Sequence, residues 1–512
     1  MAEVSRTARV IQNAKVALFF YCINLILQFF SRKIFLDYLG AELLGLNTTA
    51  QNLLQFLNLA ESGIGAAVAF ALYKPLSQGN RQEIIDIVSL QGWFYRWVGL
   101  FVIAASIVLM AFFPWIFAKA QVPLIYAYGT FIAFLISVLL GYFINYKITV
   151  LSADQKIYKI TIETQTVKII KVFIQMLAIW QLTYGYVWWM SLEVLAAVVT
   201  SIRLSYCIKK EYPWLTSQIS QGKVLKNQYS FILNKTKQLF FHKIGEFVQN
   251  QSTPLVIYGF TSLTWVAIYG NYLILMFGCL MFVDAVSRGL NAGVGNLIAR
   301  SDINSIKSVF WQLVTVRLFI AGLICSGILV LSESFVILWV GEEYVLPKFP
   351  LVTMVSIFFI QMTRTCDIFL SAYGLFQDIW APLVESLLNI LLSILFGYFW
   401  GLTGILLGVM ISQLVVVNSW KPYFLYRQGF KQSVQEYITL YSKKLFLVLI
   451  CSFISVHSFE IICSNAQLSL FDWLSSAFLF LIIYLFIGGA CFTAFDSLFR
   501  LITKKIFNYV FG

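Results

Sequence analysis

Apolar stretches long enough to cross a bilayer recur along the whole chain, and short polar breaks separate them. The hydrocarbon core of a membrane is about 30 Å thick and needs roughly 20 apolar residues per helix. This spacing predicts an all-α polytopic membrane protein with about fourteen transmembrane helices. The predicted spans are 16–36, 43–73, 88–112, 123–146, 160–181, 184–207, 238–259, 264–298, 308–331, 350–374, 379–400, 402–424, 445–463 and 473–494.

Polar residues inside five of these spans recur at the spacing of one helix face. The aligned residues are Asn47, Gln51, Gln55, Asn58, Glu61 and Ser62 in span 43–73; Asp284, Ser287, Arg288, Asn291 and Gly295 in span 264–298; Asn24, Gln28 and Ser31, beside Arg32, in span 16–36; Thr164, Lys168, Lys171 and Gln175 in span 160–181; and His242, Lys243, Glu246, Gln249 and Asn250 in span 238–259. Charged side chains within a membrane usually face a bundle interior and mark a substrate or ion path. We therefore expect the polar faces of the first two helices of each half to line a water-filled cavity.

A plainer interpretation of the same residues is that they hold helices together or extend to the headgroups. For Lys33, Arg96 and Arg317 this interpretation is favoured. For Lys168 and Lys171 both interpretations stay open, because their face begins only about two turns from the cytoplasmic edge.

Composition and charge agree with a membrane protein. Hydrophobic residues make up 60% of the chain and charged residues 12%, whereas soluble proteins carry about 25% charged residues. With a cytoplasmic N-terminus, only Lys119 and Lys348 of the 36 lysines and arginines fall in external loops. That asymmetry is the positive-inside pattern. It explains the net charge of +13 without nucleic-acid binding and puts both termini in the cytoplasm.

The residues that usually carry metals or disulfides are sparse. Eight cysteines are scattered without a C-x-x-C pair, and the two histidines, His242 and His457, cannot build a zinc site between them. We therefore expect no metal and no cofactor. The first apolar segment runs past Arg32 without a small-residue cleavage pattern, so we interpret it as a retained helix.

Four short pairings suggest that two halves of the chain are related. They are GIG at 63–65 with GVG at 293–295, Gln91 and Arg96 with Gln312 and Arg317, Trp115 with Trp339, and LSA at 151–153 with LSA at 370–372. They predict two pseudo-symmetric six-helix lobes, 1–208 and 231–424, joined by a polar cytoplasmic linker at 209–230. A basic cytoplasmic loop at 425–444 and two added helices within 445–512 complete the chain. Parallel repeats of this kind place a substrate cavity at the lobe interface.

The predicted cavity mixes cations with amides. Lysine and arginine bind phosphate through charge-assisted hydrogen bonds, and amide and hydroxyl groups suit sugars. A lipid diphosphate bearing a glycan matches that mixture. The predicted substrate-binding residues are Asn24, Gln28, Arg32, Gln51, Asn58, Glu61, Lys168, Lys171, Lys243, Asp284, Arg288 and Asn291.

The stretch RKIFLDYLGAELLGLNTTAQNLLQFLNLAESGIGAAVAFALYKPL, at 32–76, together with LSADQK at 151–156, resembles bacterial polysaccharide-biosynthesis and O-antigen flippases. These belong to the multidrug/oligosaccharidyl-lipid/polysaccharide (MOP) exporter superfamily. The resemblance implies a V-shaped cavity between two six-helix lobes. It also implies transfer of an undecaprenyl-diphosphate-linked oligosaccharide to the outer leaflet of the bacterial inner membrane. A monomer is expected, with membrane lipids and glycan-assembly proteins as partners.

The lipid II flippases of the same superfamily are similar at further positions. Arg32 matches their arginine on the first span, and Ala60-Glu61-Ser62-Gly63 looks like their A-E-G sequence with one residue inserted. Some relatives couple transport to sodium. That likeness implies an ion-coupling role for Glu246, Glu385 and Asn389. The acid Glu385 and the amide Asn389 follow each other in the opposite order to the acid/amide pair of those relatives. Either Na+ or H+ therefore remains as the coupling ion.

Two other classes of function compete with the flippase. A multidrug exporter shares the fold and would favour an acidic, aromatic cavity. A membrane glycan polymerase or ligase would need catalytic groups on a large external loop, and the external loops here are short. A scaffold role is weaker still, because polar faces inside a membrane are costly to keep.

Overall fold

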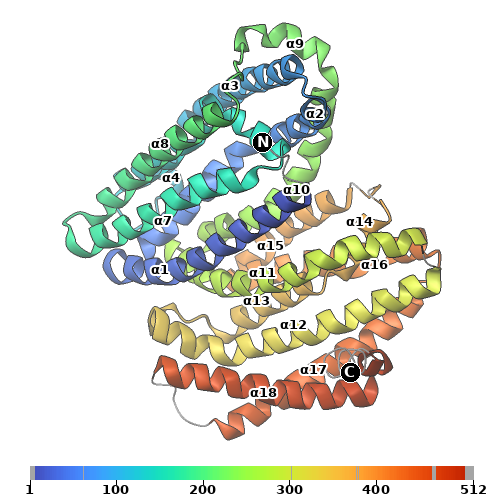
Figure 1. Cartoon of the computed structure of the whole chain (residues 1–512). Helices are drawn as coiled ribbons and strands as arrows, with labels where there is room; N and C mark the ends of the chain where they lie inside the picture. Colours follow the sequence, from blue (N-terminus) through green and yellow to red (C-terminus); the bar gives the residue numbers. More distant parts are fainter. Residues whose placement is uncertain are drawn as a thin grey trace. The chain divides into compact units, whose positions relative to one another are not determined.

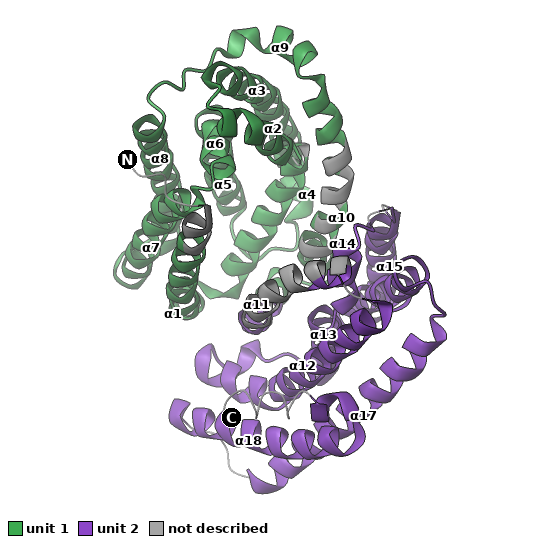
Figure 2. Cartoon of the chain, turned by 45° about the vertical axis from the view of Figure 1, so that its right-hand side comes forward, with its two compact units in different colours: residues 1–267 green, residues 268–512 purple. Residues whose placement is uncertain are grey.

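The computed structural model describes residues 6–61, 63–300, 302–375, 377–378, 380–463 and 469–501. Every regular element in these ranges is a helix, as Figure 1 shows. Contacts divide the chain into unit 1, residues 1–267, and unit 2, residues 268–512 (Figure 2). Helix α11, Leu263–Arg300, crosses this boundary.

Unit 1 contains the helices α1 (Arg6–Asn58), α2 (Ile64–Gln78), α3 (Arg81–Ala111), α4 (Phe113–Ile116), α5 (Leu124–Phe143), α6 (Ile148–Ala153), α7 (Ile157–Gln181), α8 (Gly185–Glu211), α9 (Gly222–Gln228) and α10 (Ser230–Phe260). Short 3-10 turns η1 (Leu59–Glu61), η2 (Asn145–Lys147) and η3 (Ile219–Gln221) join some of them. Helix α7 packs between α1 and α8, α5 packs against α1, α3 and α8, and α10 packs against α1 and α2.

Unit 2 contains α12 (Ile303–Trp339), η4 (Glu342–Tyr344), α13 (Lys348–Met362), α14 (Thr365–Ala372), α15 (Trp380–Gln413), the π-helical η5 (Leu414–Trp420), α16 (Lys421–Phe424), the π-helical η6 (Leu425–Phe430), α17 (Gln435–Ile462) and α18 (Leu470–Phe495). Helices α17 and α18 pack against each other and against α12. The ammonium of Lys444 on α17 is buried and bonds Asp496, just after α18, and Thr315 on α12. These bonds fasten the two added helices to α12.

Within the described residues, each predicted span overlaps one or more helices. Ten helical segments in the described ranges are long and apolar enough to cross a membrane. The two longest helices have breaks between predicted spans: α1 at Gly40, with φ 80° and ψ 170°, and α15 at Trp400 and Gly401. The span 43–73 begins in α1 and continues into α2, and the span 402–424 begins in α15 and continues through η5 into α16. The spans at 160–181 and 238–259 correspond to α7 and α10, which are not among the ten. The protein is thus an all-helical polytopic membrane protein.

The two LSA tripeptides form the same structure. Each ends a short helix, α6 or α14, and is followed by a residue in the left-handed conformation, Gln155 with φ 60° and Gly374 with φ 68°. The closing backbone bonds also match: the amide of Lys156 donates to Leu151 O at 2.8 Å, and that of Leu375 to Leu370 O at 2.9 Å. These are the bonds of a Schellman cap. The matching caps agree with the predicted internal repeat.

The predicted linker at 209–230 is folded onto unit 1. Helix α9 and η3 pack against α3. Ser89 accepts a hydrogen bond from the amide of Gln218 at 2.8 Å. The position of Gly222 leaves no space for a side chain, because a Cβ there would overlap the ring of Trp93. Contacts therefore place the whole linker, and α10 after it, in unit 1.

Candidate functional site

The candidate site centres on a break in the helix that carries Glu61. Helix α1 ends at Asn58, one 3-10 turn follows, and α2 begins after Gly63. Gly63 has φ 97°, a left-handed conformation that glycine adopts without steric cost. Glu61 therefore lies in a 3-10 turn between two α-helices.

Two tyrosines hold this break from neighbouring helices. The hydroxyl of Tyr95, on α3, donates to Glu61 Oε1 at 2.6 Å, and that of Tyr142, on α5, donates to Asn58 Oδ1 at 3.1 Å. The two rings meet edge to face with centroids 5.4 Å apart. Gly65 leaves the space that Tyr95 needs, since a Cβ there would lie 3.2 Å from its hydroxyl. The sequence pattern did not indicate either tyrosine, because nothing distinguishes them from the other tyrosines of the chain.

The polar face of span 43–73 has two uses in the structure. Asn47 is buried, and its Oδ1 accepts a hydrogen bond of 2.6 Å from the hydroxyl of Tyr186 on α8. Gln51 and Gln55 are exposed. The plainer interpretation, contact between helices, therefore describes Asn47, whereas the two glutamines have the exposure that a substrate-binding role requires. That they line a water-filled cavity between lobes stays a prediction.

The neighbours Arg32 and Lys33 have different surroundings. Arg32 is half-buried, and its Nη2 donates to the carbonyl of Ala267 at 2.8 Å. Lys33 is exposed and pairs with Asp37 one turn later at 3.2 Å. The surface interpretation of Lys33 agrees with this contact. On the same helix, Asn24 donates to Gln165 Oε1 of α7 at 3.0 Å, and Gln28 is exposed.

Lys168 and Lys171, which the sequence left between two interpretations, differ in their contacts. Lys171 Nζ lies 2.6 Å from Glu193 Oε1 on α8, and the same oxygen accepts a bond of 3.0 Å from Gln175. Lys168 lines a cavity of about 260 Å³ between α5, α7 and α8. The sequence pattern did not indicate Glu193, although it is the one acidic residue in span 184–207.

The two predicted ion-coupling residues of unit 2 are buried on one face of α15. Glu385 is 1% exposed and Asn389 2% exposed. Ser393, one turn further, donates to Asn389 Oδ1 at 3.4 Å and to the carbonyl of Ile405 at 3.0 Å. The structure therefore brings acid and amide together, and their binding of an ion stays a prediction.

Five predicted site residues have side chains outside the described residues. They are Lys243, Glu246, Asp284, Arg288 and Asn291.

Comparison with known proteins shows which solved structures share this fold. No family model and no curated protein matches the sequence. Solved structures do match it, and they include a flippase and several transporters. This chain shares its fold with these solved structures, two of which are described as transporters of the MOP superfamily.

The likeness to the lipid II flippase MurJ, in an inward closed conformation, covers 94% of this chain and 99% of that chain, with a TM-score of 0.61 and 15% identity. An inward-facing multidrug resistance transporter of the MATE family matches 80% of this chain and 95% of its own, with a TM-score of 0.58 and 12% identity. A MOP superfamily transporter from Pyrococcus furiosus, described as having a binding pocket of reverse polarity, matches 83% of this chain and 97% of its own at a TM-score of 0.50 and 12% identity. At these identities the likeness shows the fold alone.

Proposed function

We propose that this chain is a flippase for a lipid-linked oligosaccharide. It moves an undecaprenyl-diphosphate-linked glycan from the inner to the outer leaflet of a bacterial cytoplasmic membrane, for O-antigen or capsule biosynthesis. The observation that carries the proposal is the likeness to the lipid II flippase MurJ along almost the full length of both chains. Transport proceeds by alternating access, with the two lobes rocking around a shared cavity.

The polar residues of unit 1 supply the chemistry that this substrate needs. A guanidinium such as that of Arg32 can bind a diphosphate through two parallel hydrogen bonds. The exposed amides of Gln28 and Gln51 suit sugar hydroxyls. In this proposal Asp284, Arg288 and Asn291 act from the second half of the chain. Glu246, Glu385 and Asn389 bind the coupling ion, Na+ or H+.

The test of this function is the lipid that copurifies with the protein. Wild type is compared with Arg32→Ala, and with Lys33→Ala as the matched control, because Lys33 is exposed and pairs with Asp37 one turn along the same helix. Mass spectrometry should find a prenyl-diphosphate glycan with the wild type and with Lys33→Ala. It should find at least about tenfold less with Arg32→Ala, as expected for the loss of charge-assisted bonds worth roughly 1.5–3 kcal/mol. Ordinary phospholipid alone in every sample would contradict the proposal.

A multidrug exporter is the second candidate, and the carboxylate of Glu61 is the observation that favours it. Among the described side chains, Glu61 bonds a neutral tyrosine and no cation, so it could attract a cationic drug. The likeness to a MATE family transporter also covers most of both chains. Efflux of a cationic dye that Glu61→Gln abolishes, together with unchanged glycan export in a deletion strain, would establish this function in place of the flippase.

A further inference from the structure

Unit 1 contains a polar cavity apart from the Glu61–Tyr95 contact. It has a volume of about 260 Å³ and is bounded by α5, α7 and α8, with Asn145 of η2 at its wall. The polar residues that line it are Ser137, Asn145, Thr164, Lys168, Lys171, Glu193 and Thr200. All of them belong to one compact unit, so the cavity does not depend on how the two units are arranged.

The charges around the cavity do not cancel. Lys171 and Glu193 neutralise each other as an ion pair. Lys168, one turn before Lys171, makes no hydrogen bond or ion pair within the described part of the chain. It lies about 16 Å along α7 from the first residue of that helix, at 1.5 Å per residue. A cation at such a depth needs water or a counter-charge, because the surroundings have a low dielectric constant.

Two further hydrogen-bond donors face the same space without a partner among the described residues. Asn145 is only 6% exposed, and its Oδ1 accepts a bond from Ser205 at 3.3 Å, but its Nδ2 donates no bond. The hydroxyl of Thr200 makes no bond with any described residue either. Thr200 is half-buried, and neither donor atom is enclosed by protein, so both are accessible from the cavity. An anionic ligand there can accept a hydrogen bond from each of them.

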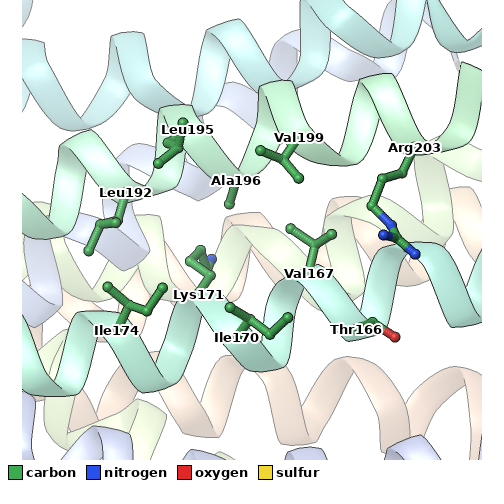
Figure 3. A pocket seen from close by; sticks show the side chains of 10 residues that line it. All are labelled: Thr166, Val167, Ile170, Lys171, Ile174, Leu192, Leu195, Ala196, Val199 and Arg203. Atoms are coloured by element: carbon green, nitrogen blue, oxygen red, sulfur yellow. The ribbon is translucent and has the colours of Figure 1, made fainter.

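The opposite side of the α7–α8 contact has different chemistry. Figure 3 shows the side chains that line a groove there, of about 190 Å³; they include the aliphatic side chains of Ile170, Ile174 and Leu195. Arg203 lies at one end of the groove and pairs with Glu163 at 2.6 Å. Among the described residues, the cation without a counter-charge, Lys168, lines the cavity and not this groove, where Arg203 is paired with Glu163.

We propose that the cavity between α5, α7 and α8 binds a phosphoryl group, held by Lys168, Asn145 and Thr200. The source of that group is the diphosphate of the lipid-linked substrate, so this assignment rests on the proposed function. The volume suits a diphosphate with a few waters and not a whole glycan, since a water occupies about 30 Å³. The sugar therefore lies elsewhere.

Binding to the purified, detergent-solubilised chain tests the assignment. The probes are farnesyl diphosphate, farnesol as its uncharged counterpart, and inorganic pyrophosphate. Lys168→Gln should weaken binding of farnesyl diphosphate at least about tenfold, because it removes one charge-assisted hydrogen bond. Lys168→Arg keeps the charge and should bind within a few-fold of wild type. Arg203→Gln is the matched control, since it removes one positive charge from the groove side.

Each outcome decides a different claim. Equal binding of farnesyl diphosphate by wild type and Lys168→Gln would overturn the cavity assignment and leave the proposed function standing. Pyrophosphate binding that depends on Lys168, without competition by farnesyl diphosphate, would establish a site for a free anion and overturn the lipid source. No binding of any phosphorylated probe to wild type would overturn both. A thermal unfolding curve for each variant confirms that the folded protein was compared.

Discussion

The helix pair α7–α8 of unit 1 and the two segments of α15 in unit 2, 380–399 and 402–413, hold the same place in the element order. Each pair follows a short helix that ends with LSA and a left-handed residue. Their contacts nevertheless differ. The α7–α8 pair has the Lys171–Glu193 ion pair and a polar cavity beside it, whereas the α15 segments close directly on each other.

Glycine accounts for the difference. A Cβ on Gly404 would overlap the carbonyl of Phe396, and one on Gly408 would overlap the backbone of Ser393, so the α15 segments touch backbone to backbone. Helix α7 has no glycine, and α8 has one only at its first residue, Gly185. Long side chains therefore fill the space between α7 and α8. Helix spacing, set by small residues, thus decides whether polar side chains line a cavity or become buried.

The largest expected effect follows from forcing apart the two α15 segments, whose backbones touch at Gly408. Gly408→Ala places a methyl group against the backbone of Ser393, which no change of rotamer can relieve. We expect a loss of about 3 kcal/mol in the free energy of unfolding, near the upper end for overpacking. Thermal unfolding in detergent measures it. Gly489→Ala on α18, where the Cβ meets open space, is the control and should lose nothing. An unchanged Gly408→Ala variant would contradict the backbone contact.

A second prediction addresses the ion pair of unit 1. Lys171→Met leaves Glu193 without its cation and should lower stability by about 2 kcal/mol. Breaking a fully buried pair costs roughly 3–5 kcal/mol, and both side chains here keep 16% exposure, which reduces the penalty. Adding Glu193→Gln to Lys171→Met should recover part of the loss. The four proteins form a double-mutant cycle, and strictly additive effects would show that the two side chains do not interact.

A smaller effect is expected at the matching caps. Gln155 holds a left-handed conformation that costs a residue with a side chain about 1–2 kcal/mol, whereas Gly374 adopts it freely. Gln155→Gly should therefore stabilise the protein by about 0.5 kcal/mol, after the entropic cost of glycine. Gly374→Ala should destabilise it by about 1 kcal/mol. Thermal unfolding of both variants measures the two changes. Changes of the same sign at both positions would mean that the two caps are not equivalent.

The smallest effect concerns the N-caps of α3 and α12, two helices that correspond in the predicted repeat. Asn80 caps α3 with a neutral amide, and Asp302 caps α12 with a carboxylate. Hydrogen bonds from the hydroxyl and the amide of Ser305 hold the pKa of Asp302 below its usual range. The ionised cap therefore stabilises α12 above the unfolded pKa of about 3.9, and this contribution is lost as pH falls through the lower folded value.

Asp302→Asn keeps a capping side chain and removes the charge. Its unfolding temperature should fall less than that of wild type when pH is lowered from about 5 to about 3, the range around the usual carboxyl pKa. Asn80→Ser, which changes one neutral cap for another, is the control. Parallel pH profiles for wild type and Asp302→Asn would rule out a contribution from the Asp302 carboxylate.

Much of the architecture could be predicted from particular stretches of sequence. The apolar runs predicted the positions of the spans, and the two LSA tripeptides were paired from the sequence and form the same cap in the structure. Both signals are local. The polar face of span 43–73 did not predict the surroundings of each of its residues. Asn47 and Gln51 belong to the same predicted face, yet one is buried against Tyr186 and the other is exposed. A helical wheel gives the direction of each side chain, but it does not show which neighbouring helix that side chain contacts.

By itself the sequence determined that the chain is a helical membrane protein with polar residues inside its spans. Hydrophobic length and local backbone preference are sufficient for that, since neither depends on distant residues. Only the tertiary structure decided which polar groups are paired. Tyr95 reaches Glu61 across 34 positions of sequence, and Glu193 neutralises Lys171 but not Lys168. Such partners depend on the packing of whole helices, where a single glycine can open or close the space between them.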